Sequence, residues 1–388
     1  MQVYFDNAAT TAVDKNVLKK MLPYFTEKYG NPSSIHYLGQ EALEAVDESK
    51  EIISKFLNCR AEEVFFTSSA TESNNLAIKG VLEGLDFKPH IITSLIEHPS
   101  VIEVCKYLEK EGKAEVSYIK PNTEGIIGLE SIKKEIKNNT VLISIMYANN
   151  EIGTIQDIKN IGSLIKELNI DRKNKILFHT DAVQAGAYLN CDIKELGVDL
   201  LTLSGHKIYG PKGVSVLFIK EGIKIKPIIY GGGQEMGLRS GTYNIPSIVG
   251  MGAAIEEIKK NKDKIEDIKK LRDYLIKEIE KNIPLVSLNG SREQRLPNNI
   301  NFNFKGVEGE SVVISLNQEG IMASSGSACA SKKLKASGVL LAIGIRQEEA
   351  HGSLRISLGR ETTKKEIDYF LKVLPNIIKR LRAISGFK

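Results

Sequence analysis

Short β-rich runs alternate with helix-length polar stretches between residues 64 and 219. The runs have the length and the β-branched content of buried strands. This alternation predicts an α/β domain with a mostly parallel sheet. Ligands of such sheets bind beyond the carboxyl ends of the strands, so polar residues that close a strand are candidates for a functional site. The runs are VFFT at Val64, HIITS at His90, VLISI at Val141, ILFHTD at Ile176, LLTLS at Leu200 and VSVLFI at Val214.

A different pattern begins at residue 248. A Lys- and Glu-rich stretch as far as Ile283 carries isoleucines and leucines near helical spacing, which predicts a bridging amphipathic helix. Beyond it, NNINFNF and SVVISL are interpreted as strands, and TTKKEIDYFLKVLPNIIKRL as a helix that a threonine caps. Because 388 residues exceed what one core usually serves, we expect a second, smaller domain here.

Composition excludes several classes of protein. No apolar run is long enough to cross a bilayer, and the opening MQVYFDNAATT lacks the features of a signal peptide, so we expect a soluble, cytoplasmic protein. The four cysteines form no C-x-x-C pair, and we expect no metal site. The net charge of +5 is spread over lysines beside glutamates, which favours a solvated surface over stable nucleic-acid binding.

The segment SGHKIYGPKG follows the strand-like run LLTLS directly. It places Lys207 at the mouth of the sheet, after Ser204 and His206 and before several glycines. A lysine in this position suits a cofactor that is held through an aldehyde and a phosphate. Taken alone, the segment is equally compatible with a surface lysine in a glycine-rich turn.

The segment HTDAVQ closes another strand with Asp181. A carboxylate at the end of a buried strand is costly to desolvate unless it meets a cation, and a protonated pyridine nitrogen is such a cation. The alternative is that Asp181 caps a short helix that begins at Ala182.

The segment FTSSATESNNLAIKG leads from a strand through small hydroxyl residues into a helix. Free N–H groups and the positive end of the helix dipole make such a turn a phosphate site, facing the N–H of Ala70 and Thr71. The alternative is a capping box with Thr71 or a neighbouring serine as the cap.

The segment ASSGSACAS surrounds Cys329 with small residues. Such residues give the thiol little to pack against, which favours an exposed, reactive cysteine over a structural one. Cys59, Cys105 and Cys191 stand among residues that could bury them.

Together these segments resemble the cysteine desulfurases of the NifS/IscS group, which have the pyridoxal-phosphate fold of aspartate aminotransferase. The resemblance implies a large α/β domain at 13–257 with a mostly parallel seven-stranded sheet. It also implies a small α+β domain, made of 1–12 and 258–388, that carries a mobile loop with the catalytic cysteine. The matching segments run almost end to end: YFDNAATT, NPSSIHYLG, FTSSATESNN, IEHPSV, ANNEIGTIQ, HTDAVQ, SGHKIYGPKG, GGGQEMGLRSGTYN, RLPNNINFNF, SSGSACAS and SLRISLGR.

The resemblance also implies a role for each matching residue. Catalysis would fall to Cys329, Lys207 and His98, with pyridoxal 5'-phosphate held by Lys207 as a covalent imine. The cofactor would be contacted by Ala70, Thr71, His98, Asn149, Asp181, Gln184, Ser204, His206 and Lys207, and by Thr242 from the neighbouring subunit of a homodimer. Arg355 would bind the carboxylate of the substrate in a two-pronged contact, assisted by Asn149.

The activity implied is removal of sulfur from L-cysteine, which gives L-alanine and a persulfide on Cys329. An iron-sulfur scaffold or a tRNA-thiolating enzyme would then accept the sulfur. The sequence differs from the family's pattern at Met236, where the family usually has arginine.

Two other functions are compatible with the same residues. One is a selenocysteine lyase or another enzyme of this fold, and the second is a non-catalytic scaffold that binds the cofactor. A nucleotide-binding protein is excluded because G-x-x-x-x-G-K-[ST] and G-x-G-x-x-G are both absent.

Overall fold

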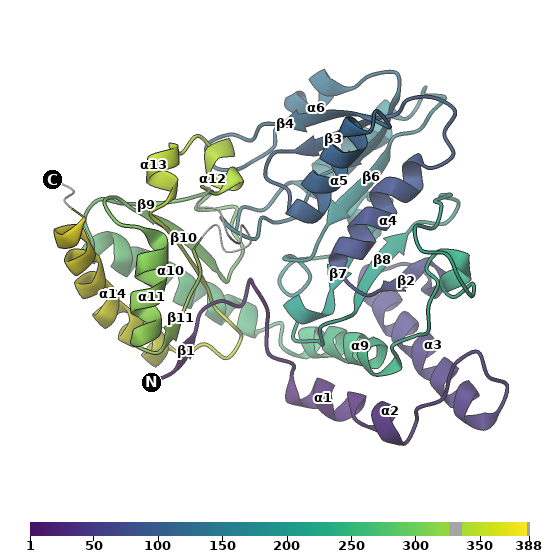
Figure 1. The fold of residues 1–388 in the computed structure, drawn as a ribbon, viewed down its shortest axis with the longest axis horizontal. Helices are drawn as coiled ribbons and strands as arrows, with labels where there is room; N and C mark the ends of the chain where they lie inside the picture. Colours follow the sequence, from purple (N-terminus) through teal and green to yellow (C-terminus); the bar gives the residue numbers. More distant parts are fainter. Residues whose placement is uncertain (326–335, 386–388) are drawn as a thin grey trace.

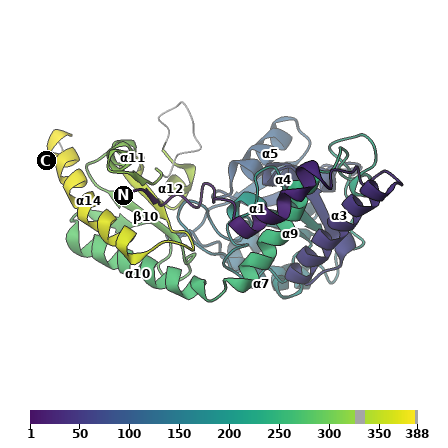
Figure 2. The same ribbon diagram turned by 90° about the horizontal axis from the view of Figure 1, so that it is seen from below.

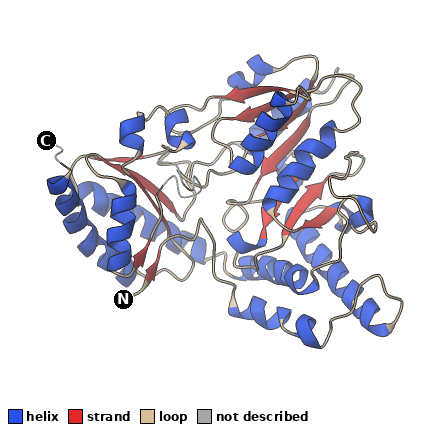
Figure 3. Ribbon diagram, in the orientation of Figure 1, coloured by secondary structure: helices blue, strands red, loops and turns tan. Residues whose placement is uncertain are grey.

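A seven-stranded sheet forms the centre of the larger part of the computed structural model, which describes residues 1–325 and 336–385 (Figures 1 and 3). All strands run parallel except β8, which is antiparallel to both of its neighbours. The mostly parallel sheet predicted from the alternation is confirmed. Its spatial order is β2 (Val64–Thr67), β8 (Ser215–Ile219), β7 (Leu200–Ser204), β6 (Leu177–Asp181), β5 (Thr140–Ser144), β3 (His90–Ser94) and β4 (Glu115–Ile119).

Helices cover both faces of this sheet, which is why its central strands are buried along their whole length. Ile78 and Val101, on α4 and α5, belong to the core on one face, and Ile53, Ile161 and Ile255 belong to the core on the other. The first face is covered by α4 (Ala70–Leu82) and α5 (Pro99–Lys110), and the second by α3 (Tyr37–Leu57), α6 (Leu129–Glu135), α7 (Ile158–Leu168), α8 (Ile193–Leu196) and α9 (Ile245–Lys260), with α1 (Lys15–Met21) and α2 (Pro23–Thr26) against α9.

A second core surrounds a small antiparallel sheet of order β12 (Ser353–Ser357), β10 (Asn299–Phe304) and β9 (Val286–Leu288). Figure 2 shows its helices on the side of the molecule away from α3 and α4. The N-terminus joins this part, because β1 (Val3–Tyr4) pairs with β11 (Ile321–Met322) and Phe5 packs edge-on against Phe370. The helices are α10 (Lys264–Asn282), α11 (Gly309–Gln318), α12 (Gly338–Ala342), α13 (Gln347–Ala350) and α14 (Lys364–Ile384). The division of the chain at residues 12 and 257 stays a prediction.

Two predicted elements differ from the structure. The segment SVVISL lies in helix α11, where Val312, Ser315 and Leu316 face the core at helical spacing although the run is rich in β-branched residues. The bridging helix is two helices, α9 and α10, because α9 ends at a cap on Asn261. The C-terminal helix α14 begins as predicted, with Thr363 and Glu366 in a capping box.

No helix within residues 1–325 and 336–385 is long and apolar enough to span a membrane, and no cluster of side chains there could hold a metal ion.

Candidate active site

A cavity of about 540 Å³ lies beyond the carboxyl ends of β6 and β7. Its volume is in the range that ligand pockets usually have. The walls come from the two parts of the molecule and from the N-terminal segment. They include nine of the residues selected from the sequence, which are Ala70, Thr71, His98, Asp181, Gln184, Ser204, His206, Lys207 and Arg355.

Lys207 ends the 3-10 turn η2 (Gly205–Lys207), which follows β7 without a linker. Its Nζ donates hydrogen bonds to the backbone oxygens of Ala8 at 2.5 Å and Ala9 at 2.7 Å. The amine is therefore held inside the cavity by the N-terminal segment. Gln184 shares one of these acceptors, since its Nε2 donates to Ala8 O at 3.0 Å.

Asp181 is buried at the end of β6. Its Oδ2 accepts a hydrogen bond from Asn74 Nδ2 at 2.8 Å, and its Oδ1 accepts one from the backbone of Val183 at 3.0 Å. Residues 183–188 form turns, so Asp181 does not cap a helix. Both hydrogen bonds come from neutral groups, which fits a carboxylate whose cationic partner is a ligand in the cavity.

The start of α4 lines another wall. Ser69 is the cap, with its Oγ accepting from Glu72 N at 3.2 Å, so a serine and not Thr71 has this role. The N–H groups of Ala70 and Thr71 belong to the first turn and have no acceptor within the helix. Lys212 also lines the cavity. These donors and this charge fit a phosphate group.

Ser204, at the end of β7, and His206, in the turn η2, also line the cavity. Ser204 Oγ accepts from Ser215 Oγ at 3.2 Å, and His206 Nδ1 lies 3.2 Å from Thr10 Oγ1. Burial, followed by the charges of Lys207 and Lys212, lowers the pKa of His206 to about 4. A neutral ring at this position can donate a hydrogen bond to an anion without adding charge.

His98 caps helix α5, and its Nδ1 accepts from the backbone N–H of Ser100 at 3.2 Å. Burial lowers the pKa of His98, the charge of Asp181 opposes this change, and Lys207 adds to it. The ring therefore lies in the cavity as a neutral imidazole.

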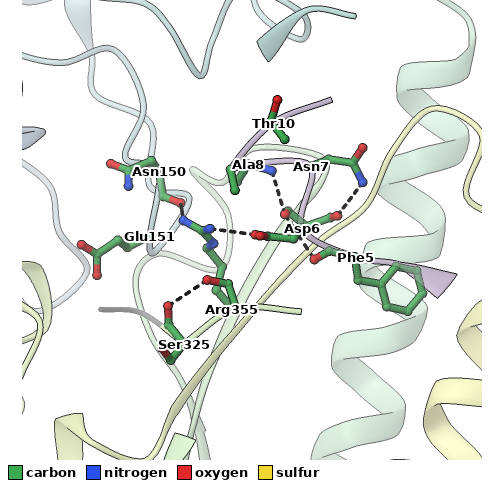
Figure 4. A network of polar contacts seen from close by, with 12 residues as sticks. Phe5, Asp6, Asn7, Ala8, Thr10, Asn150, Glu151, Ser325 and Arg355 are labelled. Atoms are coloured by element: carbon green, nitrogen blue, oxygen red, sulfur yellow. Dashed lines mark hydrogen bonds and ion pairs between the residues drawn. The ribbon is translucent and has the colours of Figure 1, made fainter. Parts of the chain in front are cut away.

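Arg355 is at the centre of β12 and is buried. Figure 4 shows its guanidinium between Asp6 and Asn150: Nη2 lies 2.8 Å from Asp6 Oδ1, and Nη1 donates to Asn150 O at 3.1 Å. Nε is also buried and has no hydrogen-bond partner among the described residues. A planar donor with unused N–H groups at a cavity wall is suited to a carboxylate.

Two predicted site residues do not line this cavity. Asn149 is completely buried behind the wall, where Nδ2 donates to Ile96 O and Oδ1 accepts from the backbone of residues 151 and 152. Thr242 is exposed and lines a smaller cavity of about 230 Å³, which shares Ser68, Gly213 and Val214 with the first. Cys329 lies outside the described residues. Their roles stay predictions.

The sequence reasoning assigned no role to the N-terminal segment. Its residues nevertheless hold the lysine turn, since Thr11 N donates to His206 O at 2.9 Å and Thr11 Oγ1 accepts from Tyr209 N at 2.9 Å. Asp6 was missed in the same way. The only available signal was that YFDNAATT is one of the matching segments.

Comparison with known proteins identifies the class to which a chain with this fold and this cavity belongs. The model of the family Aminotransferase class-V matches residues 3–370, and the chain belongs to this family, which uses pyridoxal phosphate.

More particular relatives narrow the activity. The chain is 50% identical over 389 residues to the cysteine desulfurase IscS of Dictyoglomus turgidum, covering 100% of this chain and 97% of the relative. It is 47% identical to the cysteine desulfurase IscS of Methanosarcina thermophila, covering 99% and 93%. A solved NifS-like protein superposes with a TM-score of 0.91 at 38% identity, covering 98% and 100%. The chain is a cysteine desulfurase of the IscS/NifS group.

A further solved structure bears on the substrate. SspA in complex with cysteine matches with a TM-score of 0.81 at 37% identity, covering 93% of this chain and 100% of that one.

Proposed function

We propose that this cysteine desulfurase holds pyridoxal phosphate through Lys207 and passes the sulfur of L-cysteine to Cys329. The observation that carries the proposal is one cavity in which Lys207, Asp181, His98 and Arg355, from four separate segments, face the same space. Lys207, Asp181 and Arg355 each have a chemical task that the others cannot perform.

The polar groups of the cavity fit the cofactor in three places. The N–H groups at the start of α4, with Ser204 and His206, suit its phosphate. Asp181, whose hydrogen bonds come from neutral groups, suits a protonated pyridine nitrogen. Lys207 supplies the amine for the aldehyde. When bound, pyridoxal phosphate supplies an electron sink that makes the Cα proton of cysteine removable.

The residues of the chain supply the remaining chemistry. Arg355 binds the carboxylate of cysteine and fixes the direction in which the rest of the molecule points. Lys207 Nζ is the amine positioned to take the Cα proton. The Cys329 thiolate then attacks the sulfur of the substrate: a sulfur–sulfur bond forms, and the carbon–sulfur bond breaks with its electron pair left on Cβ. That carbon takes up the proton that the thiol released, and alanine leaves.

A homodimer is part of the proposal. Within one chain, Thr242 lines a smaller cavity that shares Ser68, Gly213 and Val214 with the cavity of Lys207. The resemblance assigns its phosphate contact to the neighbouring subunit. Several large apolar side chains are also exposed on this chain, among them Ile35 at 96%, Tyr230 at 78%, Tyr37 at 76% and Met236 at 65%. A partner subunit over such residues would remove them from water.

The proposed acceptor of the sulfur follows from the similarity to cysteine desulfurases named IscS. We expect an iron-sulfur scaffold or a tRNA-thiolating enzyme, which copurification with the enzyme and mass spectrometry would identify.

Borohydride reduction followed by peptide mapping tests the cofactor assignment. The label should be found on the peptide that contains Lys207, and Lys207→Ala should not be labelled. Lys212 lies in the same cavity and is the internal control. A label on Lys212 would contradict the assignment.

A further inference from the structure

A continuous line of hydrogen bonds connects Asp181 with His98 through two residues that the proposed mechanism does not use. Asn74, on α4, is completely buried, and its Nδ2 lies 2.8 Å from Asp181 Oδ2 and 2.8 Å from Ser100 Oγ. Ser100 is in the first turn of α5, and its Oγ lies 2.9 Å from His98 Nδ1. All four side chains are therefore coupled.

The direction of every bond in this line follows from the chemistry of the groups. The amide nitrogen of Asn74 has two protons and no lone pair to offer, so it donates to both Asp181 and Ser100. The opposite orientation of the amide would bring its oxygen against the Asp181 carboxylate, which is also an acceptor. In the present orientation Asn74 Oδ1 is buried and has no partner among the described residues. In this orientation both amide protons of Asn74 are donated, while its oxygen stays unpaired within the described part of the chain.

The hydrogen bond from Asn74 determines which group donates between Ser100 and His98. Its Oγ already accepts from Asn74, so its own proton is available for His98 Nδ1. The backbone N–H of Ser100 points at the same atom, at 3.2 Å. Two donors thus converge on Nδ1, and a neutral ring with two donors at Nδ1 carries its proton on Nε2.

We propose that Asn74 is a positioning residue that holds the Asp181 carboxylate and, through Ser100, fixes His98 as the tautomer with its proton on Nε2. The inference rests on the proposed roles of Asp181 and His98 in this active site. The lowered pKa of His98 agrees with a ring that stays neutral. His98 then faces the cavity with an N–H donor, and it has no lone pair there with which to remove a proton. Abstraction of the Cα proton falls to Lys207.

The tautomer can be measured without any assay of activity. The holoenzyme is labelled with ¹⁵N-histidine, and long-range proton–nitrogen correlation spectra are recorded at neutral pH. The chain has six histidines, and His98→Gln identifies the signals of His98 by their loss. We expect an unprotonated Nδ1 and a protonated Nε2. A protonated Nδ1, as the other tautomer or as an imidazolium, would overturn the proposal.

Two variants test the role of Asn74, with a matched control. Asn74→Leu removes both donors at similar size, which frees the Ser100 hydroxyl to accept from Nδ1, so the Nδ1 signal should move toward the protonated position. The control is Asn75→Leu, because Asn75 Nδ2 donates to Thr71 O and contacts neither Asp181 nor Ser100. An unchanged His98 spectrum in Asn74→Leu would contradict the proposal. Wild-type spectra decide the tautomer even if this variant does not fold.

Ser100→Ala tests whether the coupling runs through the hydroxyl. In this background the backbone donor persists, and adding Asn74→Leu should cause no further shift at His98. A further shift would mean that Asn74 reaches His98 by another route. For the reaction, Asn74→Leu should lower kcat about tenfold and change KM for cysteine less than about twofold, because Arg355 is untouched.

Failure of this inference is separable from failure of the proposed function. Borohydride labelling at Lys207 together with a protonated Nδ1 on His98 would overturn the inference alone. Labelling of another lysine, with the expected tautomer, would overturn the assignment of Lys207 alone.

Discussion

Arg355 Nη2 lies 2.8 Å from Asp6 Oδ1, so the guanidinium that faces the cavity is held by a carboxylate from the N-terminal segment. The two residues are 349 positions apart in the sequence. Asn150 O holds the other side of the guanidinium, as Figure 4 shows. The orientation in which Arg355 meets a substrate therefore depends on both parts of the molecule.

We predict that Asp6→Ala impairs binding of cysteine more than it impairs turnover. Loss of the carboxylate leaves Arg355 buried with one anchor, so its N–H groups no longer point in a fixed direction. KM for cysteine should rise about tenfold, with kcat within about threefold of wild type. Asp6→Asn keeps an acceptor at the same position, so its KM for cysteine should lie between those of the wild type and Asp6→Ala. An unchanged KM in Asp6→Ala would mean that Asp6 does not position Arg355.

Arg355→Lys should bind cysteine more weakly than the wild type, because a positive charge alone is not sufficient. A lysine can replace the positive charge but not the pair of parallel N–H donors. We expect KM for cysteine to rise by about tenfold or more, which corresponds to the loss of about one charge-assisted hydrogen bond. Steady-state alanine production over a range of cysteine concentrations is the measurement. An unchanged KM would show that the substrate carboxylate binds elsewhere.

Asp181→Asn should keep the fold and lose most of the turnover. The amide still fills the end of β6, but it has no charge with which to keep a pyridine nitrogen protonated. We expect kcat to fall by at least about a hundredfold, while circular dichroism is unchanged. Near-normal alanine production would indicate that Asp181 only orders its own turn through the contact with Val183 N.

The free energy of unfolding should depend on pH through His179. This ring is completely buried between Ser144 Oγ and Thr202 Oγ1, and burial lowers its pKa to about 4, with Asp181 opposing the change. Well above pH 6.5 both the folded and the unfolded chain hold a neutral ring. As the pH falls from 6.5 towards 4, the unfolded chain binds a proton that the folded chain does not, so the free energy of unfolding falls.

His179→Gln is the comparison for this effect. Glutamine can bond to the same two hydroxyls but does not titrate. Between pH 7 and pH 4.5 the wild type should lose up to about 3 kcal/mol more than the variant, as measured by urea unfolding. Equal losses in both proteins would show that His179 makes no contribution.

The sequence predicted those parts of the structure that depend on local pattern. Six of the seven strands of the large sheet were visible as β-rich runs, and β4 was not among them. Asp181 was selected because it closes such a run, and Lys207 because it follows one. The run SVVISL was misinterpreted because its β-branched content outweighed the helical spacing of Val312 and Leu316, which only the core makes evident.

The residues that orient the site could not be selected in this way. Asp6 acquires its role from Arg355, and Asn74 acquires its role from Asp181, 107 positions away. An aspartate near the N-terminus or an asparagine in a helix has no local mark of such a partner. Only the folded chain brings each pair together.

The last prediction concerns the cysteine that receives the sulfur. A thiol must lose its proton before it can attack, and burial raises the pKa of Cys59, Cys105 and Cys191 to about 12. These three thiols stay protonated at neutral pH and are poor nucleophiles. Cys329, the fourth, lies outside the described residues and stays the predicted acceptor.

Cys329→Ser should therefore abolish catalytic release of alanine, because a hydroxyl is far less acidic and less nucleophilic toward sulfur than a thiol. The variant should still bind cofactor and cysteine, since those steps use Lys207, Asp181 and Arg355. Alkylation of the wild type after incubation with cysteine should place the persulfide on the Cys329 peptide and leave the other three cysteines unmodified. Undiminished alanine output from Cys329→Ser, or a persulfide on one of the other three cysteines, would show that sulfur leaves the substrate by another route.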